Sequence, residues 1–305
     1  MKGTSSIPQR ILVVRGGAIG DFVLTLPVLG ALRAAHPRAV VAVLGARECG
    51  ELAVAGGLAD EARVLDSREW TGFFVKNGAC DEGACKWLAD FDWVISFLHD
   101  PKEVFQINVC RASGARFVKG CHRPADGAGD SAAKVLLRAL EPLGIMDVGA
   151  VPRLELSPTE QDGPNGDVLA VHPGSGGAAK NWPEKNWAEF LSQWMEQMDA
   201  DLLLVGGEAE AERVARLSAR LPRERHRILL HAPLVEVARA LGECCAFVGH
   251  DSGITHLAAA VGLPGVVLWV DTDAIVWRPP SEAMDLLQQP IAPNAVLRAV
   301  TTFFK

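Results

Sequence analysis

The chain has 305 residues, 49% of them hydrophobic and 22% charged, and its 30 Lys and Arg stand against 37 Asp and Glu for a formal net charge of −7. This composition excludes a disordered chain, and the length suits two domains of about 150 residues each. No apolar run approaches the roughly 20 residues that cross a bilayer. The polar start lacks the apolar centre of a signal peptide, so we expect a cytoplasmic protein.

The negative charge lies in the second half of the chain. Residues 1–150 hold 17 Lys and Arg and 17 Asp and Glu, whereas residues 151–305 hold 13 and 20. An acidic chain without a basic stripe is not expected to bind nucleic acid. The seven cysteines lack the C-x-x-C spacing of a metal site, and Cys80 and Cys85 have no His partners for zinc. We interpret them all as reduced thiols.

In the first half, short apolar runs rich in β-branched residues alternate with helical patterns. The runs predict strands over residues 11–15, 40–44, 63–65, 93–97 and 116–118. The helical patterns cover residues 21–35, 47–55, 102–110 and 131–143.

The same alternation returns in the second half. Strands are predicted over residues 168–172, 201–205, 227–230, 246–249 and 266–269. Helices are predicted over residues 186–197, 209–220, 234–242 and 254–261. Residues 281–305 are expected to be partly helical and to pack back across the first domain.

Short, fully apolar strands that alternate with helices predict an α/β fold with parallel sheets covered on both faces. Three prolines and several glycines mark residues 144–167 as a linker. The boundary is therefore placed near residue 160, which gives a domain of residues 1–160 and a domain of residues 161–305. Because ligands bind at the carboxyl ends of parallel strands, we expect a ligand cleft between two doubly wound domains.

The first motif, RGGAIGD at residues 15–21, directly follows the opening strand. Gly17 and Gly20 allow a tight turn and a close approach of the backbone to a ligand. The dinucleotide pattern G-x-G-x-x-G would need glycine where Arg15 stands, and no acidic residue closes the second strand. Asp21 is either an N-cap of the following helix or a general base.

The second motif, HPGSGGAAKNWP at residues 172–183, follows the first strand of the second domain. Ser175 and the glycines offer hydroxyl and backbone donors to an anion, and Lys180 offers a positive charge. This is not the Walker pattern, because no glycine precedes Lys180 and Asn181 follows it. The alternative is an exposed turn without a ligand.

The third motif, VGGE at residues 205–208, places an acidic residue after a strand and a double-glycine turn. Glu208 is able to accept hydrogen bonds from two ribose hydroxyls. It is equally suited to favour the N-terminus of the next helix electrostatically.

The fourth motif, VGHDSGITHLAAA at residues 248–260, joins a strand to a helix that begins at Ser252 and Gly253. Free backbone amides and the hydroxyls of Ser252 and Thr255 suit a diphosphate. His256 lies about one turn into the helix, where it either faces the same ligand or belongs to the core. Asp251 would repel a phosphate, so we expect it to cap the turn or to pair with Lys180.

Together these motifs resemble those of glycosyltransferase family 9, which includes the bacterial ADP-heptose:lipopolysaccharide heptosyltransferases. Residues 15–27 are similar to the family's R-x-G-A-[IL]-G-D loop and the T-L-P element after it. Residues 172–184 resemble its H-P-G-[ST]…K-x-W-P segment, and residues 251–258 resemble its D-[ST]-G-x-x-H-[LI]-A signature. The similarity runs over nearly the whole chain in the family's order.

The resemblance implies a GT-B fold of two Rossmann-like domains, with the acceptor on the first and a nucleotide-sugar donor, ADP-linked, on the second. It implies an inverting glycosyltransferase that needs no metal and no other cofactor. Asp21 would be the base, Lys180 would stabilise the leaving diphosphate and Glu208 would hold the ribose. The residues expected around the donor are Gly17, Gly20, Ser175, Lys180, Glu208, Asp251, Ser252, Gly253, Thr255 and His256.

The chain departs from the family at residues 270–274, where VDTDA replaces G-P-T-D-P. The lost glycine and prolines would reshape the loop beside the donor sugar. Asp271 and Asp273 also spell the D-x-D pattern of metal-dependent glycosyltransferases. Since Lys180 and a helix terminus already supply positive charge, we do not expect a metal there.

The acceptor is expected to be a saccharide or a glycolipid. Four basic residues of the first domain either meet acidic groups of the acceptor or of the cytoplasmic face of the inner membrane, or form a solvated loop. They are Arg111, Arg116, Lys119 and Arg123. Two other functions stay open, a non-catalytic protein that binds nucleotide sugars and an NAD-dependent oxidoreductase.

Overall fold

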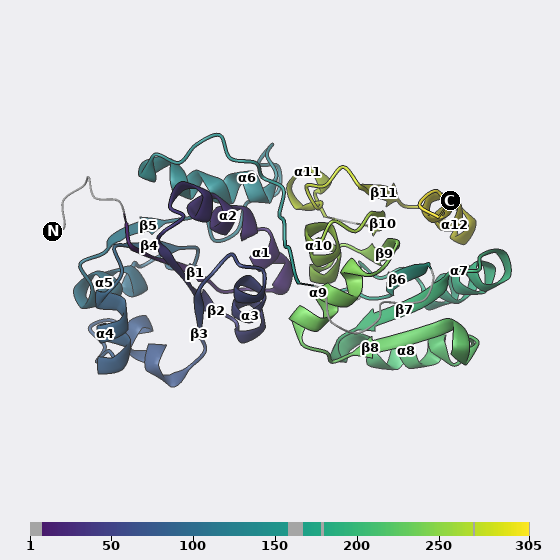
Figure 1. The fold of residues 1–305 in the computed structure, drawn as a ribbon, viewed down its shortest axis with the longest axis horizontal. Helices are drawn as coiled ribbons and strands as arrows, with labels where there is room; N and C mark the ends of the chain where they lie inside the picture. Colours follow the sequence, from purple (N-terminus) through teal and green to yellow (C-terminus); the bar gives the residue numbers. More distant parts are fainter. Residues whose placement is uncertain (1–7, 158–166, 178–179, 271, 305) are drawn as a thin grey trace. The chain divides into compact units, whose positions relative to one another are not determined.

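The computed structural model describes residues 8–157, 167–177, 180–270 and 272–304. The chain divides into two compact units, Met1–Ala125 with Ala132–Ala150, and Asp126–Ser131 with Val151–Lys305. Within the described ranges no helix is long and apolar enough to cross a membrane. Figure 1 shows both units as sheets flanked by helices.

The first unit contains a five-stranded parallel sheet in the order β3-β2-β1-β4-β5. Its strands are β1 (Arg10–Arg15), β2 (Val40–Gly45), β3 (Glu61–Val64), β4 (Trp93–Ser96) and β5 (Arg116–Lys119). Its helices are α1 (Ile19–Val23), α2 (Leu26–Ala35), α3 (Arg47–Ala55), η1 (Arg68–Phe74), α4 (Glu82–Ala89), α5 (Val104–Ala112), α6 (Ala132–Leu137) and η2 (Arg138–Leu143). The order places β1 at the centre, so the loop after β1 lies at the middle of the carboxyl edge.

Two helices of this unit differ most clearly from the sequence prediction. The helix predicted over residues 21–35 is two helices, because Thr25 begins a new one and Pro27 stands in its first turn. Proline has no N–H to donate to the preceding turn, so it is stable only at such a start. The helix α4 was not predicted; its N-cap is Asp81, whose Oδ1 accepts a hydrogen bond from Ala84 N at 2.9 Å.

The second unit contains a six-stranded parallel sheet in the order β11-β10-β9-β6-β7-β8. Its strands are β6 (Val168–His172), β7 (Asp201–Gly206), β8 (His226–Leu230), β9 (Ala246–His250), β10 (Gly265–Trp269) and β11 (Met284–Gln288). Its helices are α7 (Glu184–Gln197), η4 (Glu208–Glu210), α8 (Ala211–Ser218), η5 (Arg223–Arg225), α9 (Leu234–Gly242), α10 (Gly253–Ala260), α11 (Ala274–Trp277) and α12 (Pro293–Thr301). These elements include β11, an edge strand that was not predicted.

The end of the chain corrects one expectation. Instead of crossing to the first unit, α12 packs against α7 and places Val296, Leu297 and Val300 in the core of the second unit. Its apolar face matches the Trp-rich face of α7, where Trp187 and Trp194 are fully buried. The burial of this face is a sufficient physical reason for its position.

The chain enters the second unit before the predicted linker ends. Leu154 is buried, and its N–H donates to Ala260 O at 2.8 Å, so residues 151–157 pack on the second unit. An earlier excursion, Asp126–Ser131, also belongs there. Gly127 N donates to Asp273 Oδ2 at 2.8 Å, and Trp277 Nε1 donates to Asp126 Oδ1 at 2.6 Å.

Candidate active site

In the first unit, the glycine loop after β1 positions Asp21. Gly17 has a φ of +99°, which favours glycine, and a side chain there would approach Asp21 Oδ2 to 2.9 Å. Asp21 lies in the first turn of α1, and its Oδ2 accepts a hydrogen bond from Ala18 N at 3.2 Å. The N-cap of α1 is Ala18, so the prediction that Asp21 is the N-cap is wrong; Asp21 is the third residue of the helix and caps it from there with one carboxylate oxygen.

A buried cation fixes this loop. Arg15, only 3% exposed, places Nη2 at 3.6 Å from Asp21 Oδ1 and donates from Nη1 to His122 O at 2.7 Å. Burial lowers the pKa of Arg15, while the charge of Asp21 opposes that change. The Asp21 side chain is itself 24% exposed, so its carboxylate is held in place and still accessible.

The second unit carries the predicted anion-binding loop between β6 and α7. Ser175 is buried, and its Oγ lies 3.0 Å from both Gly177 O and Asn181 Oδ1. Lys180 Nζ lies 2.6 Å from Asp251 Oδ2. The predicted pairing of Lys180 with Asp251 is confirmed, and it brings the loop after β6 to the loop after β9.

Two buried histidines brace these loops, and the sequence analysis did not predict either role. His250 Nε2 accepts from Trp182 N at 2.8 Å, so Nδ1 carries the proton and donates to Gly174 O at 3.1 Å. His172 Nδ1 lies 2.9 Å from Val205 O. Burial lowers the pKa of His250 to about 4 and also lowers that of His172. Both imidazoles are therefore neutral at pH 7.

The N-terminus of α10 is shaped by the serine and threonine predicted there. Ser252 is its N-cap, with Oγ accepting from Thr255 N at 3.3 Å. Thr255 is fully buried, and its hydroxyl donates to His250 O. Gly253 begins the helix and is partly exposed. His256 is 5% exposed, and its role as a donor ligand stays a prediction.

The acidic residues after β7 differ in environment. Glu208, the predicted ribose ligand, is exposed at the start of η4. Glu210 is buried; its Oε2 accepts from Gly207 N at 3.0 Å. A side chain at Gly174 would approach Glu210 Oε1 to 2.6 Å, so glycine is required where the two loops meet. Glu210 follows the N-cap Gly207 by three residues, which is the spacing of a capping box, and this spacing could have indicated its structural role.

Residues 270–274, which depart from the family pattern, contact Asp251, the partner of Lys180. Thr272 Oγ1 donates to Asp251 Oδ2 at 2.7 Å, and Asp271 lies outside the described residues. Asp273 Oδ1 accepts from Ile275 N at 2.9 Å, while its Oδ2 accepts from Gly127 N. In the described part of the chain, no three His, Cys, Asp or Glu residues cluster as metal ligands would.

Three of the four basic residues of the first unit have defined hydrogen-bond or ion-pair partners. Arg111 donates to Gly78 O at 2.7 Å and Arg116 to Pro142 O at 2.6 Å. Lys119 forms an exposed ion pair with Glu103 at 3.6 Å. These contacts favour the interpretation that the residues stabilise loops.

The comparisons with known proteins agree with the fold. Residues 151–302 match the family model described as glycosyltransferase family 9 (heptosyltransferase). Lipopolysaccharide heptosyltransferase 1 of Pseudomonas aeruginosa is 34% identical over 110 residues, which are 36% of this chain and 30% of that protein. The chain thus aligns with under a third of that relative.

Solved structures match over nearly the full length. ADP-heptose lps heptosyltransferase II of E. coli superposes with a TM-score of 0.76 at 19% identity, covering 96% of this chain and 98% of that one. The glycosyltransferase family 9 protein of Veillonella parvula superposes with a TM-score of 0.74 at 18% sequence identity, and the match covers 97% of both chains. E. coli heptosyltransferase WaaC with ADP superposes with a TM-score of 0.71 at 20% sequence identity, and the match covers 96% of this chain and 99% of that one. At these identities the likeness shows the fold, which is GT-B with two parallel-sheet α/β domains. Through residues 151–302, the chain belongs to glycosyltransferase family 9.

Proposed function

We propose that the protein is an inverting glycosyltransferase that moves heptose from an ADP-linked donor to a hydroxyl of a lipopolysaccharide-type acceptor in the cytoplasm. The observation that carries this proposal is the Lys180–Asp251 pair beside the N-terminus of α10. A cation and a helix start at the carboxyl edge of a parallel sheet together suit a diphosphate.

The donor's diphosphate would take the place of Asp251 on Lys180. At 34% exposure the lysine side chain is reachable, whereas Asp251 at 12% is more deeply held. The first turn of α10 adds backbone amides that have no partner inside the helix. Ser252 and Gly253 are at this turn, so they are our donor ligands, and Thr255 shapes the turn from beneath.

The ribose is assigned to Glu208, because it is the exposed carboxylate after β7. Its buried neighbour Glu210 is engaged by the Gly207 amide and holds the loop of Gly174. Glu210 is therefore a positioning residue. Of these two acidic residues, Glu208 is assigned to the ligand and Glu210 to the structure of the loop.

Asp21 is our general base. Its carboxylate takes the proton of the acceptor hydroxyl as that oxygen bonds to the anomeric carbon and the bond to the diphosphate breaks. The negative charge that develops on the leaving diphosphate is stabilised by Lys180 and the α10 amides. Attack opposite to the leaving group inverts the anomeric centre, by the logic of inverting hydrolases.

The proposal includes no metal. Lys180 and the α10 amides supply the positive charge that a divalent cation would otherwise bring to the diphosphate. Asp273, one acid of the D-x-D pattern, has both carboxylate oxygens bonded to backbone amides. Equal transfer rates in excess chelator and in Mn²⁺ are the expected result.

The decisive experiment incubates the full chain with ADP-heptose and a heptose-free lipopolysaccharide core, and follows ADP release and the mass of the acceptor. UDP-glucose and NAD serve as competing ligands in thermal-shift binding. We expect the acceptor to gain one heptose. Binding of ADP-heptose without transfer or hydrolysis would instead indicate a non-catalytic nucleotide-sugar protein, and preference for NAD would indicate an oxidoreductase.

A further inference from the structure

Two cysteines of the first unit flank the first turn of α4. Cys80 directly precedes the N-cap Asp81, and Cys85 is the fourth residue of the helix. Side chains at these two positions pack together in the hydrophobic staple of many helix starts. Here both cysteines pack against the same core cluster of the first unit. The local fold therefore brings the two thiols together.

The pKa of Cys85 reflects this neighbour. Burial raises the pKa of Cys85, and the Cys80 sulfur, which is within hydrogen-bonding reach, raises it further. Both cysteines are free thiols and partly exposed. Two thiols that are close, reduced and accessible are the reactants of a disulfide.

The surroundings of Cys80 favour its reaction with an oxidant. Arg111 Nη2 lies 3.6 Å from Cys80 Sγ, and Gly78 O accepts from the same nitrogen and holds it there. The N-terminus of α4 follows immediately. A guanidinium and a helix N-terminus both stabilise a thiolate, the form that reacts.

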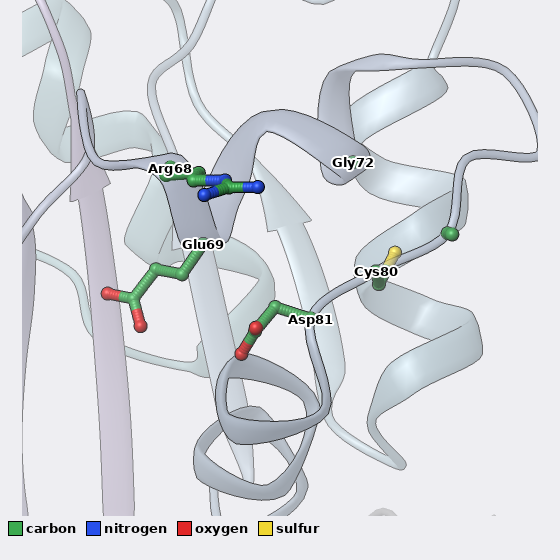
Figure 2. Close-up of a pocket in the computed structure, with 6 residues that line it drawn as sticks. Arg68, Glu69, Gly72, Cys80 and Asp81 are labelled. Atoms are coloured by element: carbon green, nitrogen blue, oxygen red, sulfur yellow. The ribbon is translucent and has the colours of Figure 1, made fainter.

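An open cavity leads to Cys80. It has a volume of about 530 Å³ and is lined by Arg68, Glu69, Gly72, Ala79, Cys80 and Asp81. Figure 2 shows Arg68 and Glu69 on η1, and Cys80 and Asp81 on the segment that leads into α4. A small peroxide has room to enter beside the sulfur.

We propose that Cys80 and Cys85 are a reversible dithiol–disulfide pair, with Cys80 as the thiol that meets the oxidant. Cys80 gives up its proton, the thiolate attacks one oxygen of a peroxide, and the O–O bond breaks; Cys80 becomes a sulfenic acid, and the departing hydroxide takes up the released proton and leaves as water. The Cys85 sulfur then attacks the Cys80 sulfur and forms the disulfide. The Cys85 proton joins the departing hydroxide as a second water, and a thiol reductant restores both cysteines.

The other cysteines provide a contrast within the chain. Burial raises the pKa of Cys49 and of Cys244 to about 12, so both are protonated at pH 7. Cys110 and Cys121 are exposed. Cys110 serves as the matched control, because it is accessible and lies next to Arg111 in the chain.

The experiment uses a convenient tryptic peptide. Cleavage after Lys76 and Lys86 releases residues 77–86, which contain Cys80 and Cys85 and no other cysteine. The full chain is treated with limiting hydrogen peroxide, blocked with N-ethylmaleimide and digested. We expect this peptide to lose two hydrogens and to escape alkylation before Cys110 reacts. Two alkylated thiols in this peptide, with Cys110 already oxidised, would overturn the proposal.

Five variants test the assigned roles. Cys85→Ser is expected to leave a Cys80 sulfenic acid that dimedone traps, whereas Cys80→Ser is expected to protect Cys85 from oxidation. Cys110→Ser should leave the disulfide unchanged. Arg111→Gln should slow its formation at least about threefold, and Arg111→Lys should restore it because the positive charge returns. Equal rates in all Arg111 variants would refute the role of that guanidinium, and dimedone labelling of Cys85 instead would reverse the assignment.

Discussion

The two units hold the loops of the proposed site by opposite electrostatic means. In the first unit, the loop after β1 is fixed by Arg15, a buried cation that touches the backbone and the carboxylate of Asp21. In the second unit, His250 holds the loop after β6 to the end of β9, His172 joins the ends of β6 and β7, and both imidazoles are buried and neutral. One brace is charged at every physiological pH, and the other is not.

The difference is one of charge at each loop. In the first unit, the buried guanidinium of Arg15 orients the carboxylate of Asp21, which we propose as the base. Neutral imidazoles brace the second pair of loops without adding a charge of their own. The positive charge of the proposed donor site is then confined to Lys180, which pairs with Asp251, and to the start of α10.

The largest effect is expected when the carboxylate of the loop after β1 is replaced by an amide of the same shape. Asp21→Asn keeps the acceptor for Ala18 N but removes the base, so transfer should fall by about 10²–10⁴ while ADP-heptose affinity is unchanged. Initial rates and calorimetry measure the two quantities. Asp66→Asn, at an exposed acid of the same unit, is the control. Transfer within a few-fold of wild type would refute the assignment.

Removal of the charged brace should be costly for folding. Arg15→Ala leaves the Asp21 carboxylate and the His122 carbonyl without their buried partner. Loss of one member of a buried pair destabilises by about 3–5 kcal/mol. The thermal midpoint of the variant measures it, with exposed Arg38→Ala as the control. Equal midpoints for the two variants would mean that Arg15 is not a brace.

The stability that His250 and His172 contribute should depend on pH, whereas the contribution of Arg15 should not. His250 has a pKa of about 4 in the folded chain and about 6.5 when unfolded, so the unfolded chain binds more protons between these values. Stability from His250 is complete above pH 6.5 and declines by roughly 3 kcal/mol as pH falls to 4. His172 contributes in the same direction. His250→Gln should flatten this part of the denaturation profile, and an unchanged slope would contradict the account.

The smallest effect is expected on ADP affinity, when Lys180 is replaced. Lys180→Ala removes a charged hydrogen bond to the diphosphate, worth about 1.5–3 kcal/mol, and should weaken ADP binding about 10- to 150-fold. Calorimetry with ADP measures it. Lys185→Ala, at an exposed lysine of α7, is the matched control. Equal affinities for both variants would remove Lys180 from the donor site.

The sheets were predictable because their central strands are buried on both faces and read as apolar runs. The edge strand β11 was missed, since its burial is partial and its residues, Met284–Gln288, mix polar and apolar side chains. The helix α4 has only eight residues and carries Gly83 in its first turn, and glycine lowers helix propensity. Local patterns carry too little signal for such marginal elements.

For the candidate site, the sequence pointed to Asp21 and to the Lys180–Asp251 pair, since both follow motif loops at strand ends. It did not reveal the braces. Arg15 reaches His122 across 107 residues, and His250 reaches Gly174 across 76. Such roles depend on tertiary contacts, and one sequence gives no signal for them. In the first motif, Arg15 was considered only as the residue that spoils a dinucleotide pattern.

The segment Asp126–Ser131, which belongs to the second unit, affects how chimeras of this protein can be built. Because of it, the backbone passes between the units three times, at 125/126, 131/132 and 150/151. A chimera cut once at residue 150 would take α11 and its capping residue Asp273 from one parent and Gly127, which Asp273 binds, from the other. Recombination that respects both units must transfer two separate gene segments, so the two units are less freely exchanged in this chain than in a protein with a single linker.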